Sequence, residues 1–194
     1  MNDKNSELMD LLPQLLSIAE EAGEAILQVY NASQDIEVIT KGDDSPVTKA
    51  DHAAHEVIDC GLKALTPDIP RLSEEGAIPA FEERSSWGRY WLIDPLDGTK
   101  EFINKNDEFT VNIALIDGAE AILGFVYVPV TGALYYGAKN LGAWKEINGE
   151  KKPIQARSMP LGKDLTVVGS RRHGAEALDE MLKTIEPKFN AINL

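Results

Sequence analysis

The stretch that decides the fold is Trp91-Leu92-Ile93-Asp94-Pro95-Leu96-Asp97-Gly98-Thr99-Lys100-Glu101-Phe102-Ile103. It begins with an apolar strand, Tyr90 to Ile93, because aromatic and β-branched residues favour a half-buried pleat. The Asp, Pro and Gly residues that follow favour an abrupt turn. Pro95 biases Asp94 toward an extended backbone, and Gly98 permits a positive φ. The sequence therefore predicts two carboxylates at the mouth of a strand, where a rigid sheet holds them still.

These two carboxylates suit a hard cation. Asp94 and Asp97 are separated by Pro95-Leu96, so across a turn both can face one point, with the Thr99 hydroxyl beside them. Carboxylate oxygens on a tight loop are ligands for Mg²⁺, which also favours phosphate partners. One alternative is an ordinary solvated turn. Another is a phosphatase with an aspartyl nucleophile, but there the two acids are separated by one residue, and the longer spacing here argues against that covalent mechanism.

Two flanking segments can add to this site. Residues 69–72 are predicted to form a strand that ends in Ser73-Glu74-Glu75-Gly76, so two neighbouring strand ends can bring their acids together. A helix is predicted from Thr48 to Leu65, capped by Thr48 or Ser45, with Asp51 in its first turn. The alternatives are a solvated turn for Glu74 and a favourable dipole partner for Asp51.

The rest of the chain predicts separate blocks of helices and strands. Helices are expected at residues 7–30, 79–86 and 175–184, and strands at 37–40, 109–116, 121–128, 133–138, 142–147, 165–168 and 189–194. Four consecutive strands without an intervening helix indicate antiparallel pairing, hence an α+β or layered fold. The polar stretch from Trp144 to Pro153 suggests a lobe boundary, with one lobe at 1–150 and the start of another at 151–194.

Composition narrows the partners. The chain has 32 acidic and 19 basic residues, a net charge of −13, which argues against a polynucleotide partner. A metal ion can still invert the local field and admit an anionic small molecule. We expect no transmembrane segment and no secretory signal, which makes the cytoplasm the default location, with peripheral attachment to the inner face of a membrane as an alternative. Cys60, the single cysteine, is expected on a buried helix face.

Four motifs together resemble the inositol monophosphatase superfamily of Mg²⁺-dependent, lithium-sensitive phosphatases. They are Asp94-Pro95-Leu96-Asp97-Gly98-Thr99, Ser45-Pro46-Val47-Thr48-Lys49-Ala50-Asp51, Ser73-Glu74-Glu75-Gly76 and Val167-Val168-Gly169-Ser170-Arg171-Arg172-His173. The continuation Lys100-Glu101-Phe102 is most similar to the 3'(2'),5'-bisphosphate nucleotidase branch. The resemblance implies a layered α-β-α-β-α sandwich and a Mg²⁺ cofactor.

The resemblance also implies a role for each site residue. The metal ligands would be Glu74, Asp94, the Leu96 carbonyl and Asp97; the catalytic residues would be Asp51, Glu74 and Thr99; and the substrate contacts would be Glu74, Leu96, Asp97, Gly98, Thr99, Ser170 and His173. The expected reaction is hydrolysis of the 3'-phosphate of adenosine 3',5'-bisphosphate by a metal-activated water. Asp51 would orient the Thr99 hydroxyl, and Ser170 and His173 would face the nucleoside.

One departure from the family pattern leaves alternatives open. Members carry a later Trp-Asp motif whose Asp is a further metal ligand, and this sequence has none, so we expect an incomplete C-terminal lobe. The alternatives are the same chemistry on an inositol or sugar phosphate, or a non-catalytic metal- or phosphate-binding relative. A homodimer is compatible with the resemblance.

Overall fold

The structure is a computed structural model that describes residues 3–32, 38–40, 46–158, 164–167, 175–188 and 191–193. It divides into two compact units, Met1–Ile154 and Gln155–Leu194. The first unit ends after Ile154, beyond the boundary suggested at residue 150, because the polar stretch after Trp144 forms two strands of the sheet rather than a linker. The identity of the two units as lobes stays a prediction.

The first unit contains four helices and a seven-stranded sheet within the described residues. Its helices are α1 (Asp3–Tyr30), α2 (Lys49–Leu65), α3 (Phe81–Arg84) and α4 (Thr99–Ile103), and its sheet strands are β3 (Arg71–Ser73), β4 (Arg89–Asp97), β5 (Thr110–Asp117), β6 (Glu120–Val128), β7 (Ala133–Ala138), β8 (Gly142–Ile147) and β9 (Glu150–Ile154). A further pair, β1 (Val38–Thr40) and β2 (Pro46–Thr48), is antiparallel. The α+β fold predicted from the sequence is confirmed, whereas β2 was not expected.

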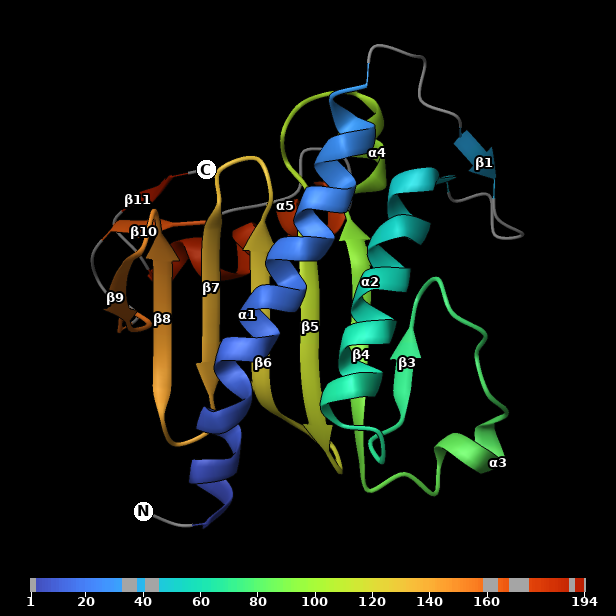
Figure 1. Ribbon diagram of the computed structural model, residues 1–194. Helices are drawn as coiled ribbons and strands as arrows, with labels where there is room; N and C mark the ends of the chain where they lie inside the picture. Colours follow the sequence, from blue (N-terminus) through green and yellow to red (C-terminus); the bar gives the residue numbers. More distant parts are fainter. Residues whose placement is uncertain are drawn as a thin grey trace. The chain divides into compact units, whose positions relative to one another are not determined.

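The sheet follows the chain order from β3 to β9. Strands β4 to β9 are antiparallel to their neighbours, as consecutive hairpins require. Only β3 lies parallel to β4, so these two strands point toward the same end of the sheet, where α4 lies (Figure 1). The acids that follow β3 and end β4 therefore meet at one edge.

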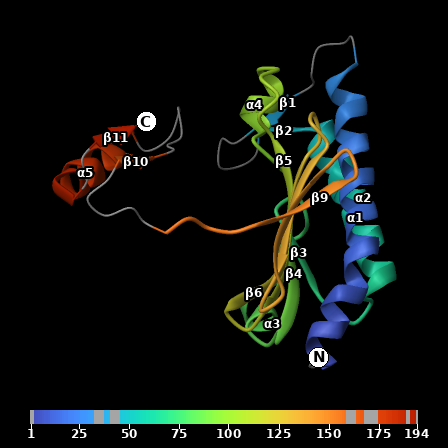
Figure 2. The same ribbon diagram turned by 90° about the vertical axis from the view of Figure 1, so that its left-hand side faces the viewer.

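Helices α1 and α2 cover one face of this sheet (Figure 2). They bury an apolar stripe against alternate strand residues such as Trp91, Ile113 and Leu115, which are almost inaccessible to solvent. Side chains in a strand alternate between faces, so the opposite face of the same strands carries Leu92, Asn112 and Ala114 instead. The hydrophobic core thus lies between the sheet and the two helices. The opposite face of the sheet carries the more polar and exposed side chains of these strands.

Two predictions about local structure were wrong. The chain does not turn after Ile93, because β4 continues through Pro95 to Asp97 and accommodates the proline at an irregularity in its pairing with β5. Cys60 is exposed on α2 rather than buried, because the helix buries Ile58 and Leu62 on the adjacent face. In α1, Pro13 lies inside the helix and is exposed to solvent.

The second unit holds a parallel pair of strands and a helix in its described part. β10 (Asp164–Thr166) pairs with β11 (Ala191–Asn193), and α5 (Ala175–Ile185) is followed by the 3-10 turn η1 (Glu186–Lys188). Parallel strands require a crossover connection, and α5 supplies it here. The predicted elements at 165–168, 175–184 and 189–194 correspond to these three.

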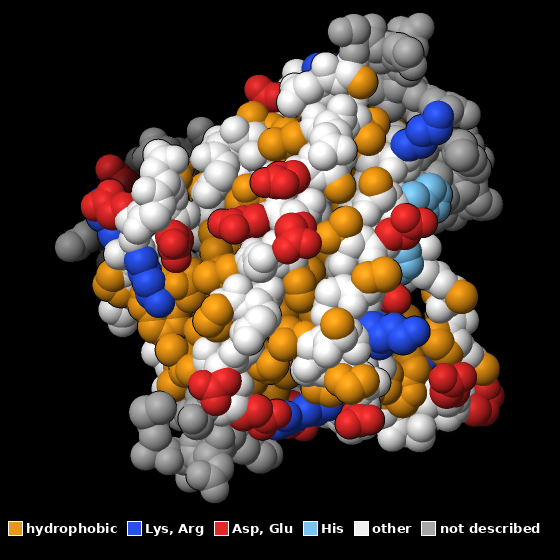
Figure 3. Space-filling view, viewed as in Figure 1, with side chains coloured by type: hydrophobic (Ala, Val, Ile, Leu, Met, Phe, Trp, Pro, Cys, Tyr) orange, Lys and Arg blue, Asp and Glu red, His pale blue; other side chains and the backbone are white. Residues whose placement is uncertain are grey.

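The face in Figure 3, seen from the helix side, carries acidic side chains scattered over the helices, with fewer basic ones between them. This distribution agrees with the net charge of −13. Among the described residues, none of the helices has the length and apolar content that crossing a membrane requires.

Candidate active site

A β-bulge in β4 brings Asp94 and Asp97 to one side of the sheet. In a regular strand, residues three apart point to opposite faces. Here Asp94 lies opposite Asn112 and Asp97 lies opposite Thr110, so β4 contains one residue more than β5 between these two pairs. That extra residue reverses the alternation and returns Asp97 to the face of Asp94. The bulge therefore explains both why the two acids are three residues apart and why a proline is tolerated between them.

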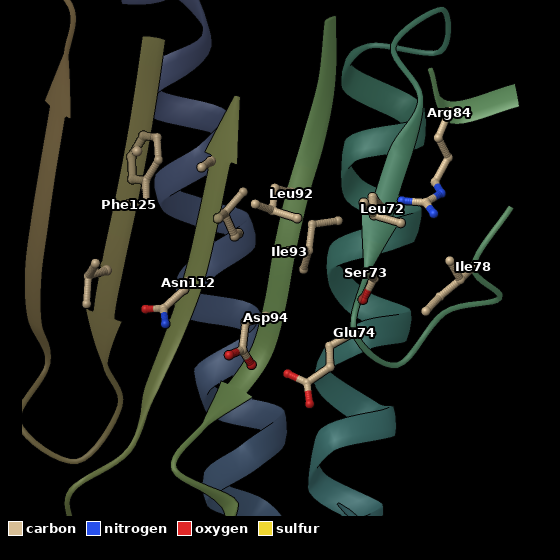
Figure 4. A pocket seen from close by; sticks show the side chains of 14 residues that line it. Leu72, Ser73, Glu74, Ile78, Arg84, Leu92, Ile93, Asp94, Asn112 and Phe125 are labelled. Carbon is tan, nitrogen blue, oxygen red and sulfur yellow. The ribbon is translucent and has the colours of Figure 1, made fainter. Parts of the chain in front are cut away.

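Glu74 reaches the same edge from the neighbouring strand. Its backbone N–H donates to the carbonyl of Ile93 at 3.1 Å, which continues the parallel pairing of β3 and β4 by one residue. In Figure 4 the carboxylates of Glu74 and Asp94 point into the same space. Glu74 is exposed and Asp94 is half-buried, so the pair lies at the rim of the sheet rather than in the core.

Asp94 is the electrostatic centre of this arrangement. Its pKa is raised to about 7, first by burial and then by the negative charges of Glu74 and Asp97 and a hydrogen bond with Glu74. One of its oxygens, Oδ1, is buried and has no hydrogen-bond partner among the described residues. A buried acceptor left in this state costs free energy. A cation would satisfy the oxygen and relieve the repulsion, so the donor set fits a metal ion.

The protein side chains alone do not complete a metal site. Across the described part of the chain, no three side chains of His, Cys, Asp or Glu gather closely enough to hold an ion by themselves. A hard cation often takes only one or two carboxylates and fills its remaining positions with carbonyl, water and phosphate oxygens. The residues present are therefore suited to a cation that shares its shell with a phosphate ligand.

Asp51 and Thr99 form a partly buried link between α2 and α4. Asp51 is 1% exposed, and its Oδ2 accepts bonds from the Thr48 N–H at 2.7 Å and the Thr48 Oγ1 at 2.6 Å. Together with the bond from the Ala50 N–H to Thr48 Oγ1, this caps α2 at Thr48, one of the two residues expected to do so. The other Asp51 oxygen, Oδ1, accepts a bond from Thr99 Oγ1 at 3.0 Å.

Gly98 makes the sharp entry into α4. Its φ is 99°, in the left-handed region that the sequence anticipated for this glycine. A Cβ at this position would lie 2.8 Å from the carbonyl oxygen of Glu108, so the close approach is to the chain itself. The following helix begins at Thr99, whose hydroxyl also lies 3.4 Å from the Leu96 carbonyl oxygen.

A pocket of about 620 Å³ adjoins the acids on the face of the sheet opposite α1 and α2. Glu74, Asp94 and Asn112 line one end, and Arg84 lies at the other end in Figure 4. The rest of its lining is largely apolar, with Leu72, Leu92 and Val126 among the residues. The acidic site therefore opens beside an apolar stretch of the sheet on which Leu92 and Val126 are exposed.

The structure brings most of the predicted site residues together. Glu74, Asp94, Leu96, Asp97, Gly98, Thr99 and Asp51 all lie at the β4–α4 edge or are joined to it by hydrogen bonds. The predicted nucleoside contacts, Ser170 and His173, lie outside the described residues. The functional roles of all these residues remain predictions at this point.

Sequence reasoning overlooked two polar residues at this edge. His55 was not among the predicted site residues, and its Nδ1 is 2.8 Å from Oγ of Ser73, the buried residue before Glu74. Asn112 was not singled out, although its Nδ2 donates to Asp97 Oδ2 at 3.1 Å. The alternation of Thr110, Asn112 and Ala114 with apolar residues indicates a shared face, but the register that sets Asn112 beside the acids is tertiary information.

Comparisons with known proteins agree with this geometry. The sequence pattern of the inositol monophosphatase family matches residues 7–192. The chain is 53% identical over 175 residues to the 3'(2'),5'-bisphosphate nucleotidase CysQ of Salmonella typhimurium, covering 90% of this chain and 69% of that protein. It is 51% identical over 175 residues to the protein of the same name from Escherichia coli K12, with the same coverage.

Solved structures show the same fold. CysQ from Bacteroides thetaiotaomicron is 32% identical with a TM-score of 0.71, and the match covers 91% of this chain and 69% of that one. A Thermotoga maritima IMPase is 21% identical with a TM-score of 0.70, covering 95% and 67%, and at that identity the likeness concerns the fold alone.

Proposed function

The chain belongs to the inositol monophosphatase family, and from this premise we infer that it is a Mg²⁺-dependent phosphomonoesterase that removes the 3'-phosphate of adenosine 3',5'-bisphosphate. The dependence on a metal ion is inferred from Asp94, which lies near the carboxylates of Glu74 and Asp97. Its buried Oδ1 has no hydrogen-bond partner among the described residues. The substrate is proposed from relatives more than 50% identical that are named bisphosphate nucleotidases.

Glu74, Asp94, Asp97 and the Leu96 carbonyl are the groups that we propose hold the metal. When bound, a divalent cation lowers the pKa of a water and stabilises charge on phosphate oxygens. The carboxylates would also position a phosphate group bound to the same cation. Glu74 and Asp97 are the exposed acids of the group, and we propose that Glu74 contacts the water that attacks phosphorus.

Thr99 is proposed to orient the attacking water. Its hydroxyl hydrogen is given to Asp51 Oδ1, so its oxygen lone pairs remain to accept a hydrogen bond from the water. Because Asp51 is buried and is also held by the capping box of α2, the direction of the Thr99 hydroxyl is fixed before substrate binds. Backbone groups at Gly98 and Thr99 would contact the phosphate, and Ser170 and His173 remain the proposed nucleoside contacts.

The first test measures phosphate release from adenosine 3',5'-bisphosphate by the whole chain with Mg²⁺ and after chelation. We expect Asp94→Asn to lower the rate by about a hundredfold or more, because it removes a charged ligand. The same change should raise the melting temperature of the metal-free protein by about 2–4 °C, since it relieves repulsion worth roughly 1 kcal/mol. Asp68→Asn, at an exposed turn, is the matched control.

Activity that survives chelation would contradict the proposal. A higher rate on inositol 1-phosphate than on the nucleotide, measured side by side, would support the inositol phosphatase alternative. Calorimetric binding of Mg²⁺ and nucleotide without any turnover would support the non-catalytic alternative.

A further inference from the structure

We propose that Asn112 is a positioning residue that fixes the Asp97 carboxylate for metal binding, and that Thr110 in turn fixes Asn112. The inference rests on the proposed function, because it takes Asp97 as a ligand. It assigns a function to two residues of β5 that lie on the face of the sheet opposite the helices.

A short chain of hydrogen bonds carries the proposal. Thr110 Oγ1 donates to Asn112 Oδ1 at 3.1 Å, and Asn112 Nδ2 donates to Asp97 Oδ2 at 3.1 Å. The carboxylate of Asp97 only accepts, so it takes the amide nitrogen, and the amide oxygen is then held by the hydroxyl hydrogen of Thr110. The amide nitrogen is then directed at the carboxylate. The three residues act in series from β5 to the end of β4.

The pairing of the strands makes this contact specific. The bulge places Asp97 opposite Thr110 and Asp94 opposite Asn112, so the side chain of Asn112 reaches Asp97 diagonally across the two strands. Asp94 receives a hydrogen bond from the backbone of Leu96. Asp97 receives its bond from a side chain instead. Asp94 also shares a hydrogen bond with Glu74, itself a proposed ligand, whereas the contact of Asp97 with Asn112 can be removed without changing a proposed ligand.

The chemistry of an amide suits this position. Asp97 is exposed, so its carboxylate would otherwise rotate freely and lose entropy on binding an ion. A hydrogen bond to Oδ2 holds the group while leaving Oδ1 open to a cation. A lysine or arginine at position 112 would also hold it, but its charge would compete with the metal. A neutral donor orients the ligand without cancelling its charge.

The test uses Mg²⁺ alone, titrated calorimetrically into the whole chain, together with steady-state rates at varied Mg²⁺. We expect Asn112→Ala to weaken Mg²⁺ binding about tenfold and to raise the Mg²⁺ concentration for half-maximal rate similarly. The KM for nucleotide at saturating Mg²⁺ should stay within about twofold, because Asn112 acts through Asp97. Outer-shell contacts of metal ligands have effects of this size.

Thr110 supplies the matched pair of variants. Thr110→Val is isosteric and lacks the hydroxyl, so it should weaken Mg²⁺ binding in the same direction as Asn112→Ala. Thr110→Ser keeps the hydroxyl and should restore wild-type affinity. The double variant Asn112→Ala with Thr110→Val should be no worse than Asn112→Ala alone, since the two residues act in series. Asn31→Ala, at the end of α1, is the control for loss of an exposed asparagine.

The outcomes separate this inference from the proposed function. Unchanged Mg²⁺ affinity in Asn112→Ala, with a folded protein by thermal melting, overturns the role of Asn112 even if the wild type is an active phosphatase. Equal losses in Thr110→Val and Thr110→Ser overturn the role of the hydroxyl. A wild type that binds Mg²⁺ but hydrolyses nothing refutes the proposed function, while the binding series still decides the role of Asn112.

Discussion

Single side chains at the site accept several hydrogen bonds at once. Asp51 accepts three, two from Thr48 and one from Thr99, with its two oxygens. An amide in its place would offer only one oxygen, so at least one donor would be left unpaired in a buried place. The carboxylate at position 51 therefore links the start of α2 to the start of α4.

Tyr30 links the end of α1 to the loop after α4 in a comparable way. Its hydroxyl donates to Asp107 Oδ1 at 2.7 Å, and its ring packs against Phe102 and Phe109. Burial, followed by the bond to Asp107, raises the pKa of Tyr30. The phenol must stay protonated to donate, so this contact depends on pH.

We predict that Tyr30 contributes stability that is lost in alkali. Because the folded pKa lies above the unfolded value of about 10, the contribution is fully present below about pH 10 and disappears as the pH rises through the folded pKa. At about pH 8, Tyr30→Phe should lower the free energy of unfolding by roughly 1 kcal/mol, and at about pH 11 the difference should narrow. Urea unfolding at both pH values, with Tyr90→Phe as the control, checks this. A difference that widens in alkali would contradict it.

At the scale of elements, the site depends on irregular backbone as much as on side chains. The bulge in β4 sets the direction of Asp97, and the left-handed Gly98 turns the chain from the strand into α4. Both features lie within a few residues of one another. Bulges next to active sites commonly redirect a side chain in this way.

The turn at Gly98 gives a second prediction. Gly98→Ala should cost roughly 2–4 kcal/mol, because an alanine is strained at a φ of 99° and its Cβ would lie 2.8 Å from the Glu108 carbonyl. Gly118 is the matched control, since its φ is 63° but a Cβ there meets nothing within 4 Å. Gly118→Ala should cost only about 1 kcal/mol. Thermal and urea unfolding measure both, and equal costs would show that the contact with Glu108 is unimportant.

For the molecule as a whole, the sheet of the first unit is packed asymmetrically. Helices α1 and α2 bury one face, and the other face bears the pocket beside the acids. Leu115 is 0% exposed on the helix face, whereas Leu92 is 44% exposed on the other. The stability of this unit should therefore come from one side of the sheet.

This asymmetry predicts unequal effects for the same substitution. Leu115→Ala should lower the free energy of unfolding by about 2–5 kcal/mol, since it leaves a cavity in the core. Leu92→Ala should cost less than about 1 kcal/mol, because much of that side chain is already in water. Equilibrium denaturation of the two variants beside the wild type decides this. Equal losses would mean that the pocket face is covered in solution.

The sequence by itself determined most of the elements, although not β2 or β9, and the chemical identity of the site. The helix at residues 7–30, the cap at Thr48 and the strands at 109–116 and 121–128 are local patterns, because helix and strand preferences act over a few residues. Asp94, Asp97, Gly98 and Thr99 could be recognised as a candidate site because they lie within one short stretch of the sequence. The resemblance to a family added roles that local patterns do not contain.

Only the tertiary structure decided how these residues face one another. The sequence predicted a turn after Ile93, but pairing with β5 keeps the chain extended to Asp97. The bulge between Asp94 and Asp97 then directs both carboxylates to the same face of the sheet. The tertiary structure also decided that Cys60 is exposed and that Asn112 lies beside Asp97. No local sequence pattern indicates either of these two features. Register and burial depend on partners distant in the chain, and a one-residue change in pairing reverses the facing of every later side chain.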